Sequence, residues 1–386
     1  MTKHDTDPFP LKIAKGEQFC NRIEERKLLS RNIALARPTV LISPGRRYGK
    51  SSLVYKVAEE VKMPFEAIDL FLAHDDKAVT KRILSGIAQL VSQIMPVSKK
   101  TLALVQNCFS SFKIAMSTAG FGIEVTHESG ATHSVDQIFD ALKALAKLAE
   151  ERKQRVILFI DEFQDIVSAE SSKAIQGAIR HVAQSTPWII FIFSGSSKSL
   201  LLELFNDKNK PLYKLCDKMI IERIASTDYI SYIQKAAKKR WKNELQTEVI
   251  VRTLTLTQLH PFYINMLCNE LWKNETPPNI ESVSKAWLAC YEQEERWIVA
   301  ELEKLTNNQQ ELLKLFALHP ISEPTSQHFV AMSGLPLSSV RQGFRSLIDK
   351  DMLHQIKQED IHLPSLKVGE YQVLDPLIGF ALRKYS

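Results

Sequence analysis

Residues 40–62 join a short apolar run to a helical pattern through a turn that contains glycine. The apolar run covers 40–42, and the apolar residues after Lys50 recur at helical spacing. Between them, positions 43–49 read Ser-Pro-Gly-Arg-Arg-Tyr-Gly. A turn of this kind after a buried strand aims backbone N–H groups and a helix N-terminus at one point, which suits phosphate groups.

This turn carries the shorter form of the phosphate-loop pattern. The full pattern G-x-x-x-x-G-K-[ST] starts with glycine, but here Pro44 takes that place and the glycine is Gly45. Lys50 is expected to reach the terminal phosphates, and the Ser51 hydroxyl is expected to hold magnesium. The alternative is a basic loop that merely opens a helix.

An acidic strand end follows about a hundred residues later. Residues 156–160 are all apolar and Asp161-Glu162 follow, as expected for a buried strand with carboxylates at its carboxyl end. In open parallel sheets, ligands bind at that end. Adjacent acids allow two roles, Asp161 for the metal and Glu162 for polarising the attacking water. The alternative is a strand that stops at a solvated acidic turn.

The bulk properties favour a globular protein of two or three domains. The chain has 386 residues, no apolar stretch long enough to span a bilayer and a polar start without a signal-peptide core, so we expect a cytoplasmic location and no membrane. The five cysteines are scattered without a C-x-x-C pair, which predicts free thiols.

The charge is unevenly distributed along the chain. Residues 1–217 hold 30 Lys and Arg against 24 Asp and Glu, whereas 218–302 (11 and 11) and 303–386 (9 and 9) are balanced. The excess positive charge therefore lies with the phosphate-binding part.

Strand and helix patterns alternate in the first part of the chain, which predicts an α/β fold with a parallel sheet covered on both faces. We expect a P-loop core over 1–225, with a possible hairpin insertion near 110–127, a helical lid over 226–302 and a winged-helix domain over 303–386. A list of the expected elements follows: helix over most of 14–37, strands at 40–43, 65–70, 155–160, 188–193, 352–356 and 371–374, and helices at 77–95, 134–152, 172–184, 227–242, 247–254, 261–273, 280–304, 307–318, 325–332 and 336–349.

These motifs together resemble the STAND-type, AAA-related P-loop ATPases of archaea and bacteria that end in a winged helix. The segment 18–25 is similar to the family's N-terminal motif, and the resemblance implies that Phe19 and Arg22 lie against the adenine. Residues 46–51 look like its phosphate loop and 161–164 like its acidic motif, and the segment 194–197, which begins with Ser194, looks like its polar sensor. His260-Pro261 looks like its lid motif.

The expected ligands are ATP and Mg²⁺. The expected catalytic residues are Glu162, Lys50 and Ser194, and the expected metal ligands are Ser51 and Asp161. The expected nucleotide-binding residues are Phe19, Arg22, Gly45, Arg46, Arg47, Tyr48, Gly49, Lys50, Ser51, Ser52, His260 and Pro261.

One departure from the family bears on rate. The family commonly has Pro-Leu-Tyr-Gly-Arg after the sensor, whereas residues 211–215 read Pro-Leu-Tyr-Lys-Leu. Lys214 is a point charge and does not replace the planar fork of an arginine finger. The sequence therefore favours slow hydrolysis.

Several residues keep a structural alternative. Ser194 is either a sensor or a helix cap, and His260 either contacts nucleotide or orients a helix. The basic run from Lys235 to Lys242 is either a solvated face or a nucleic-acid contact. Arg341, Gln342 and Arg345 share a face of the candidate recognition helix, but the neutral charge there favours a protein partner over DNA.

Three functions remain open from sequence. The first is an ATP-binding, slowly hydrolysing switch that couples nucleotide state to the lid and winged helix, with a protein partner that the sequence does not identify. The second is a DNA-binding regulator or initiator that uses ATP as an allosteric ligand. The third is a nucleotide-holding interaction protein with negligible turnover, which the position of Pro44 and the missing arginine favour.

Overall fold

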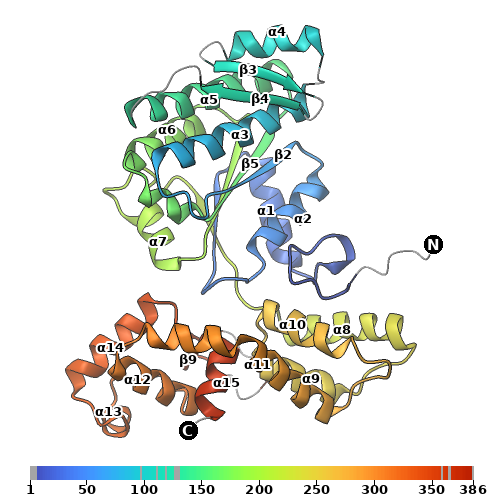
Figure 1. The fold of residues 1–386 in the computed structure, drawn as a ribbon, viewed down its shortest axis with the longest axis vertical. Coiled ribbons are helices and arrows are strands. Elements are labelled where there is room, and N and C mark those ends of the chain that lie inside the picture. The colour runs from blue at the N-terminus through green and yellow to red at the C-terminus, as the bar shows by residue number, and fades with distance from the viewer. Residues whose placement is uncertain are drawn as a thin grey trace. The chain divides into compact units, whose positions relative to one another are not determined.

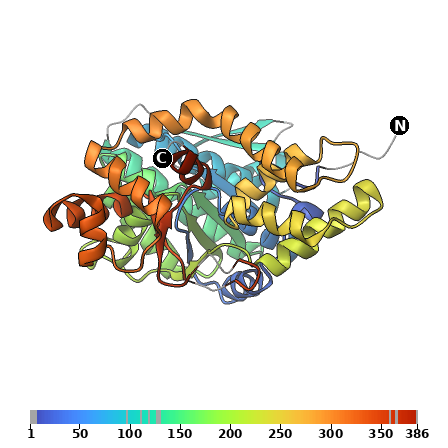
Figure 2. The same cartoon turned by 90° about the horizontal axis from the view of Figure 1, so that it is seen from below.

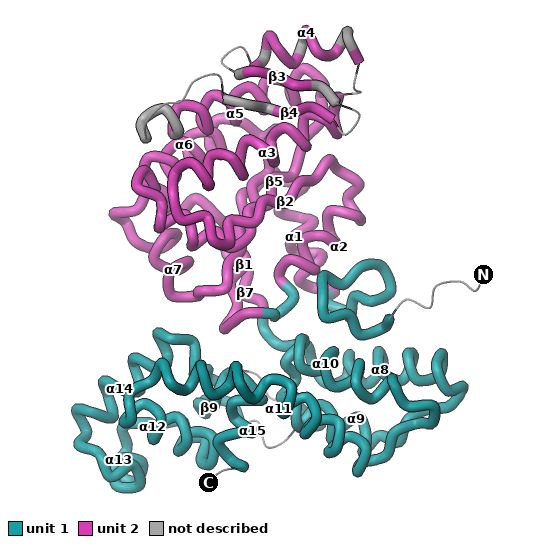
Figure 3. The backbone as a smooth tube through the Cα atoms, viewed as in Figure 1, with its two compact units in different colours: residues 1–22, 47–49, 222–386 teal, residues 23–46, 50–221 magenta. Residues whose placement is uncertain are grey.

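The computed structural model describes residues 7–95, 98–109, 112–117, 120–125, 131–357, 360–363 and 367–384. The chain forms two compact units, which Figure 3 shows in separate colours. Unit 2 consists of residues 23–46 and 50–221. Unit 1 consists of residues 1–22, 47–49 and 222–386, so a three-residue piece of the phosphate loop is grouped with the C-terminal part of the chain.

Unit 2 is built on a five-stranded parallel sheet with the strand order β2-β5-β6-β1-β7. The strands are β1 Thr39–Ile42, β2 Phe65–Asp69, β5 Val156–Asp161, β6 Ile189–Ser194 and β7 Asp217–Ile220. All residues of β1 and β6 are buried, as their continuous apolar runs predict. The sequence missed β7, because this edge strand buries one residue, Met219, and has no apolar run.

Helices cover both faces of this sheet, as expected for a parallel sheet (Figure 1). They are α1 Ile23–Ala34, α2 Lys50–Val61, α3 Asp76–Ile94, α5 Ala131–Glu151, α6 Ser172–Ser185 and α7 Lys198–Asn206, with the short 3₁₀ turn η2 Phe163–Ser168. The helices α1 and α2 lie on one side of the strands, and α3, α5 and α6 lie on the other. The α/β fold class is confirmed.

The expected hairpin insertion is present. Strands β3 Phe112–Ser117 and β4 Gly120–Val125 pair antiparallel, after helix α4 Lys99–Cys108. The strand β4 lies on α3, where the backbone N–H of Phe121 donates to the Ser92 hydroxyl at 2.8 Å. A Cβ on Gly120, whose φ is +129°, would meet that hydroxyl at 2.5 Å, so glycine is required there.

Unit 1 is largely helical. It contains the 3₁₀ turn η1 Gly16–Gln18, helices α8 Ser226–Trp241, α9 Thr247–Thr257, α10 Pro261–Leu271, α11 Ile280–Glu303, α12 Asn307–Leu318, α13 Gln327–Ser333, α14 Leu337–Asp349 and α15 Pro376–Lys384, and strands β8 Leu353–Gln355 and β9 Tyr371–Val373. Within this unit α11 contacts α9 and α10 as well as α15 (Figures 1 and 2). One apolar cluster, which includes Trp287 and Phe316, runs through all these helices except α8.

Most predicted elements of unit 1 appear near their expected bounds, including three helices followed by the antiparallel pair β8 and β9. The expectation of helix over most of 14–37 is wrong in its first part. Residues 16–18 form a single 3₁₀ turn, and α1 starts only at Ile23. Asn21 and Arg22 have φ of +48° and +57°, and two such left-handed residues interrupt a right-handed helix. The sequence also missed α15, whose nine residues include Gly379.

No helix in the described parts of the chain is both long and apolar enough to cross a membrane.

Candidate nucleotide-binding site

The phosphate loop connects the end of β1 to the first residue of α2, as the sequence predicts. The Lys50 ammonium is buried and donates to the Ser43 hydroxyl at 2.7 Å and to the Gly45 carbonyl at 3.3 Å. Gly49 has a φ of +83°, in the left-handed region that glycine tolerates best. The loop thus folds back over the Lys50 side chain, and Lys50 is held among acceptors that a phosphate would replace.

The carboxyl ends of β5 and β6 lie beside this loop within unit 2. Asp161 ends β5, and one of its carboxylate oxygens accepts a 2.5 Å hydrogen bond from the Ser51 hydroxyl of α2. The other oxygen accepts from the Ser194 hydroxyl, at the end of β6, and from the Glu162 backbone N–H at 3.0 Å. Because β5 and β6 are paired in parallel, their last residues meet at one edge of the sheet.

Glu162 is locked in place directly after β5. Its backbone is left-handed, with φ of +49°. One carboxylate oxygen accepts from Gln164 Nε2 at 2.6 Å, from the Ser196 hydroxyl at 2.7 Å and from the Ser196 N–H at 3.0 Å. Burial alone would raise the pKa of Glu162, but these hydrogen bonds and the charge of Lys50 lower it below its usual value. The carboxylate therefore stays ionised near neutral pH.

Gln164 lies close to Gly195, the residue that follows strand β6. It is buried, and a Cβ on Gly195 would lie 1.8 Å from its Oε1 atom. Only glycine at position 195 leaves room for Gln164 to reach Glu162. The pair thus ties the segment after β6 to the acidic motif after β5.

The oxygen set at this edge fits magnesium. Ser51 and Asp161 offer a hydroxyl and a carboxylate oxygen 2.5 Å apart, and oxygen ligands are those that Mg²⁺ prefers. Among the described residues, no group of three or more His, Cys, Asp or Glu is arranged to hold a metal. One carboxylate with a hydroxyl is the usual protein share of a site in which phosphates and waters complete the shell.

The loop tip at residues 47–49 has its contacts within unit 1. Tyr48 is fully buried, and its ring meets the His260 ring edge-on with centroids 4.8 Å apart. Its carbonyl accepts from Arg22 at 2.8 Å, and Arg22 also donates to the Glu222 carbonyl at 2.9 Å. The guanidinium of Arg47 lies 3.9 Å from the ring centroid of Phe262, in a cation–π contact.

Arg223 extends this set of contacts to the end of the chain. Its Nε approaches the Tyr48 hydroxyl at 3.3 Å, and one terminal nitrogen donates to the Gln258 carbonyl. The other terminal nitrogen lies 3.1 Å from His354 Nε2 and donates to the Leu374 carbonyl at 3.1 Å. The Arg223 side chain therefore contacts the loop tip, the segment before α10, strand β8 and the residue that follows β9.

The positions of Ser194 and His260 bear on their structural alternatives. Ser194 does not cap α7, because the N-cap is Ser197, whose hydroxyl accepts from the Leu200 N–H. His260 stands at the N-cap of α10 ahead of Pro261 but makes no side-chain capping bond, and its ring lies against aromatic rings instead. The basic run of α8 and the three polar residues of α14 are exposed, which leaves both of their alternatives open.

The structure brings Lys50, Ser51, Asp161, Glu162 and Ser194 together in unit 2, and Arg22, Arg47, Tyr48, His260 and Pro261 together in unit 1. Arg46 is exposed, and Phe19 and Ser52 are half-buried.

Four further residues contribute: Gln164 and Ser196 lie in motifs that the sequence identified without giving them a role, whereas Ser43 and Arg223 were missed. Ser43 follows β1 directly, as Glu162 follows β5, and this position after a buried strand was a usable signal. Arg223 carried no signal.

No protein-family model matches this sequence, and no curated protein matches it at a significant level. Among solved structures, the chain is similar to the Walker-type ATPase PABY2304 of Pyrococcus abyssi, with 18% identity, a TM-score of 0.68 and coverage of 97% of this chain and 99% of that one. It is also similar to the ORC2 protein of Aeropyrum pernix in its ADPNP–ADP complexes, with 13% identity, a TM-score of 0.58 and coverage of 99% and 96%. The chain has the P-loop nucleoside-triphosphatase fold. A largely helical C-terminal region follows that core.

Proposed function

We propose that this protein binds ATP with magnesium, hydrolyses it slowly and acts as a molecular switch. The observation that carries the proposal is the cluster at the carboxyl edge of the sheet. There the buried Lys50 and the Ser51 hydroxyl, at the start of α2, meet the Asp161 and Glu162 carboxylates, at the end of β5. In P-loop proteins a nucleotide binds at this edge of the sheet, which supports the proposal independently.

Each residue of the cluster has a distinct role. Lys50 releases Ser43 and the Gly45 carbonyl and donates to the terminal phosphates instead. Ser51 and Asp161 hold magnesium, whose chemistry at this place is to neutralise phosphate charge. Glu162, held ionised by Ser196 and Gln164, polarises the attacking water.

Ser194 lies at the carboxyl edge of the sheet, and its hydroxyl donates to the Asp161 carboxylate that we assign to magnesium. This position suits a sensor of the γ-phosphate. Phe19 and Arg22 remain proposals for the adenine. The buried Arg22 guanidinium is committed to two carbonyls, which favours a role in shaping the segment over direct stacking on the base.

The switch rests on the loop tip. Residues 47–49 are part of the phosphate loop in sequence, yet their side chains contact His260, Phe262 and Arg223. A change in the loop on phosphate binding therefore acts directly on the start of α10 and on the segment around Arg223. A nucleotide shifts such an equilibrium when its affinities for the two arrangements differ.

We assign the core to 1–225, the lid to 226–302 and the winged helix to 303–386. The neutral charge of the last domain supports a protein partner. Slow turnover follows from Leu215, which stands where relatives are expected to carry arginine. The neighbouring Lys214, whose exposed ammonium lies 5.3 Å from the Tyr213 ring centroid, does not replace that arginine.

The test is turnover of purified protein at saturating ATP and magnesium, with the variant Glu162→Gln beside the wild type. The proposal requires measurable turnover that the variant loses while it still binds ATP. Equal turnover in both proteins would show that Glu162 does not serve the reaction.

A further inference from the structure

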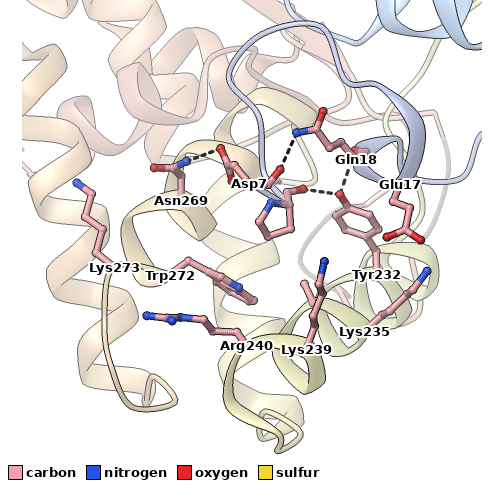
Figure 4. Close-up of a pocket in the computed structure, with 12 residues that line it drawn as sticks. Asp7, Glu17, Gln18, Tyr232, Lys235, Lys239, Arg240, Asn269, Trp272 and Lys273 are labelled. Atoms are coloured by element: carbon pink, nitrogen blue, oxygen red, sulfur yellow. Dashed lines mark hydrogen bonds between the residues drawn. The ribbon is translucent and has the colours of Figure 1, made fainter. Parts of the chain in front are cut away.

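A cavity lies in unit 1, at the far end of α10 from His260. It measures about 350 Å³ and is formed between α8, the end of α10 and the N-terminal segment 7–18 (Figure 4). This volume falls in the range of small-molecule sites, about 300–1,000 Å³. The eleven residues of α10 separate it from Pro261 by about 16 Å at 1.5 Å per residue. None of the residues that line the cavity has a role in the nucleotide site proposed above.

The walls of this cavity are fixed by the N-terminal segment. Phe9 is fully buried, with its ring 4.5 Å from that of Trp272 and 5.7 Å from that of Tyr232. The Tyr232 hydroxyl donates to the Pro8 and Gln18 carbonyls, and Asn269 donates to the Asp7 carboxylate at 3.0 Å. The segment is thus anchored at both ends, and the cavity does not depend on a ligand to form.

The charge around the cavity is positive. Lys235, Lys239 and Arg240 on α8 and Lys273 after α10 line it, against the two carboxylates of Asp7 and Glu17. Of the acids, Asp7 already accepts from Asn269 and from the Phe9 N–H. In the described part of the chain, Lys235 and Arg240 have no carboxylate partner, and Arg240 donates to the Asn274 carbonyl, whereas Lys273 is paired with Glu270. Such a lining favours an anion.

The cavity also offers apolar surface, from Trp272, Tyr232, Ala236 and Pro8. The cationic surface does not continue along α8 as a long track, because the neighbouring Lys238 is paired with Glu244 at 2.6 Å. An extended polyanion needs such a track of positive charge beyond a single hollow. A compact ligand needs only the cavity and its rim.

We propose that this cavity binds a small organic anion, with an aromatic or aliphatic body against Trp272 and Tyr232 and its charged group among Lys235, Lys239 and Arg240. A carboxylate, sulfonate or phosphate ester satisfies this chemistry. Because none of the residues that line the cavity belongs to the phosphate loop, binding does not require an intact phosphate loop.

The test is a titration with 8-anilinonaphthalene-1-sulfonate, which combines an apolar aromatic body with one negative charge. We expect saturable binding of one molecule per chain. The double variant Lys235→Glu/Lys239→Glu is expected to weaken it at least tenfold, about 1.4 kcal/mol. The matched control, Lys238→Glu/Lys285→Glu, makes the same change in net charge at exposed lysines outside the cavity and is expected to bind as the wild type does.

Two further arms keep the result interpretable. Ala236→Phe fills the cavity and is expected to abolish probe binding, with circular dichroism and thermal unfolding confirming its fold. Lys50→Ala is expected to bind the probe normally, so that failure of the nucleotide site and failure of this cavity are separate results. Equal affinity in the wild type and the cavity variants overturns the proposal. Binding of a twelve-residue oligothymidylate that displaces the probe and depends on Lys235 and Lys239 also overturns it, in favour of a nucleic-acid groove.

Discussion

The carboxyl edge of the sheet in unit 2 and the loop tip at 47–49 in unit 1 hold their groups in different ways. At the edge, hydroxyls and carboxylates stand within a few residues of strand ends, and hydrogen bonds of about 2.5–3.0 Å link them. At the tip, an aromatic ring and two arginines are held mainly by ring contacts and by backbone carbonyls. In the function that we propose, the edge acts on phosphate, whereas the tip carries a change of position to its neighbours.

The largest effect is expected at the edge, from Glu162→Gln. The amide keeps the shape of the side chain but cannot accept a proton, so turnover should fall by about 10²–10⁴ while ATP still binds. Turnover at saturating ATP and calorimetric affinity measure the two effects. Wild-type turnover in Glu162→Gln would mean that another group acts as the base.

Lys50→Ala should chiefly affect binding. Removal of a buried ammonium that contacts the terminal phosphates should cost about a hundredfold in ATP affinity, ~3 kcal/mol. Calorimetry with magnesium present measures the change, and Lys56→Ala on the same helix, a half-buried lysine that pairs with Glu59 and Glu60, serves as the control. Unchanged affinity in Lys50→Ala would rule out the phosphate-loop assignment.

Gly195→Ala tests the clamp between the acidic motif and the strand β6. Its Cβ would lie 1.8 Å from Gln164 Oε1, so Gln164 must leave Glu162. We expect turnover to fall about tenfold with ATP affinity nearly unchanged. Gly177→Ala is the control, since a Cβ there meets nothing within 4 Å and alanine favours the helix. Wild-type turnover in Gly195→Ala would show that Gln164 does not position Glu162.

Ser196→Ala tests the ionisation of Glu162. The pKa of Glu162 is lowered in the folded protein, so the ionised form and the stability it contributes are lost only as the pH falls through that lowered value. Removing the Ser196 hydroxyl should raise this pKa, and the acid limb of turnover should move to higher pH by about one unit or less. A pH–rate profile of Ser196→Ala beside Ser199→Ala measures the shift. An acid limb at the same pH in both variants would assign it to another group.

The smallest effect on binding is expected at the tip. His260→Ala removes a ring that lies against Tyr48 and Tyr263, so ATP affinity should stay within about tenfold, ~1.4 kcal/mol. The variant should instead shrink the difference between ATP and ADP in the rate of protease cutting near Pro277-Pro278. His319→Ala, an exposed histidine after α12, should leave that difference intact. If both histidine variants behave alike, His260 does not carry the signal.

The edge was predictable from the sequence because its residues follow strands. An apolar run fixes where a strand ends, and parallel neighbours place those ends together, so Lys50, Asp161 and Glu162 were found from spacing alone. Ser43 follows the same rule and was overlooked. The role of Gln164 was not predictable, since it depends on how closely Gly195 approaches.

The tip was only partly predictable. His260-Pro261 was found through a resemblance, but the contact of its ring with Tyr48 depends on tertiary packing across more than two hundred residues of sequence. Arg223 has no motif, and its partners come from four separate segments. Left-handed residues at 21 and 22 likewise interrupted a helical pattern that composition alone extended too far.

In the proposed switch, phosphate occupancy acts on α10 through residues 47–49. Hydrogen exchange of the backbone over 258–265 in the apo, ADP-bound and ATP-bound wild type tests it most directly, with α3 as an internal reference. We expect the exchange rate of this segment to differ between the ATP and ADP forms by a factor of about three or more, ~0.6 kcal/mol, while the exchange rate of α3 is the same in both. Identical exchange over 258–265 in all three forms, with nucleotide shown to be bound, would contradict it.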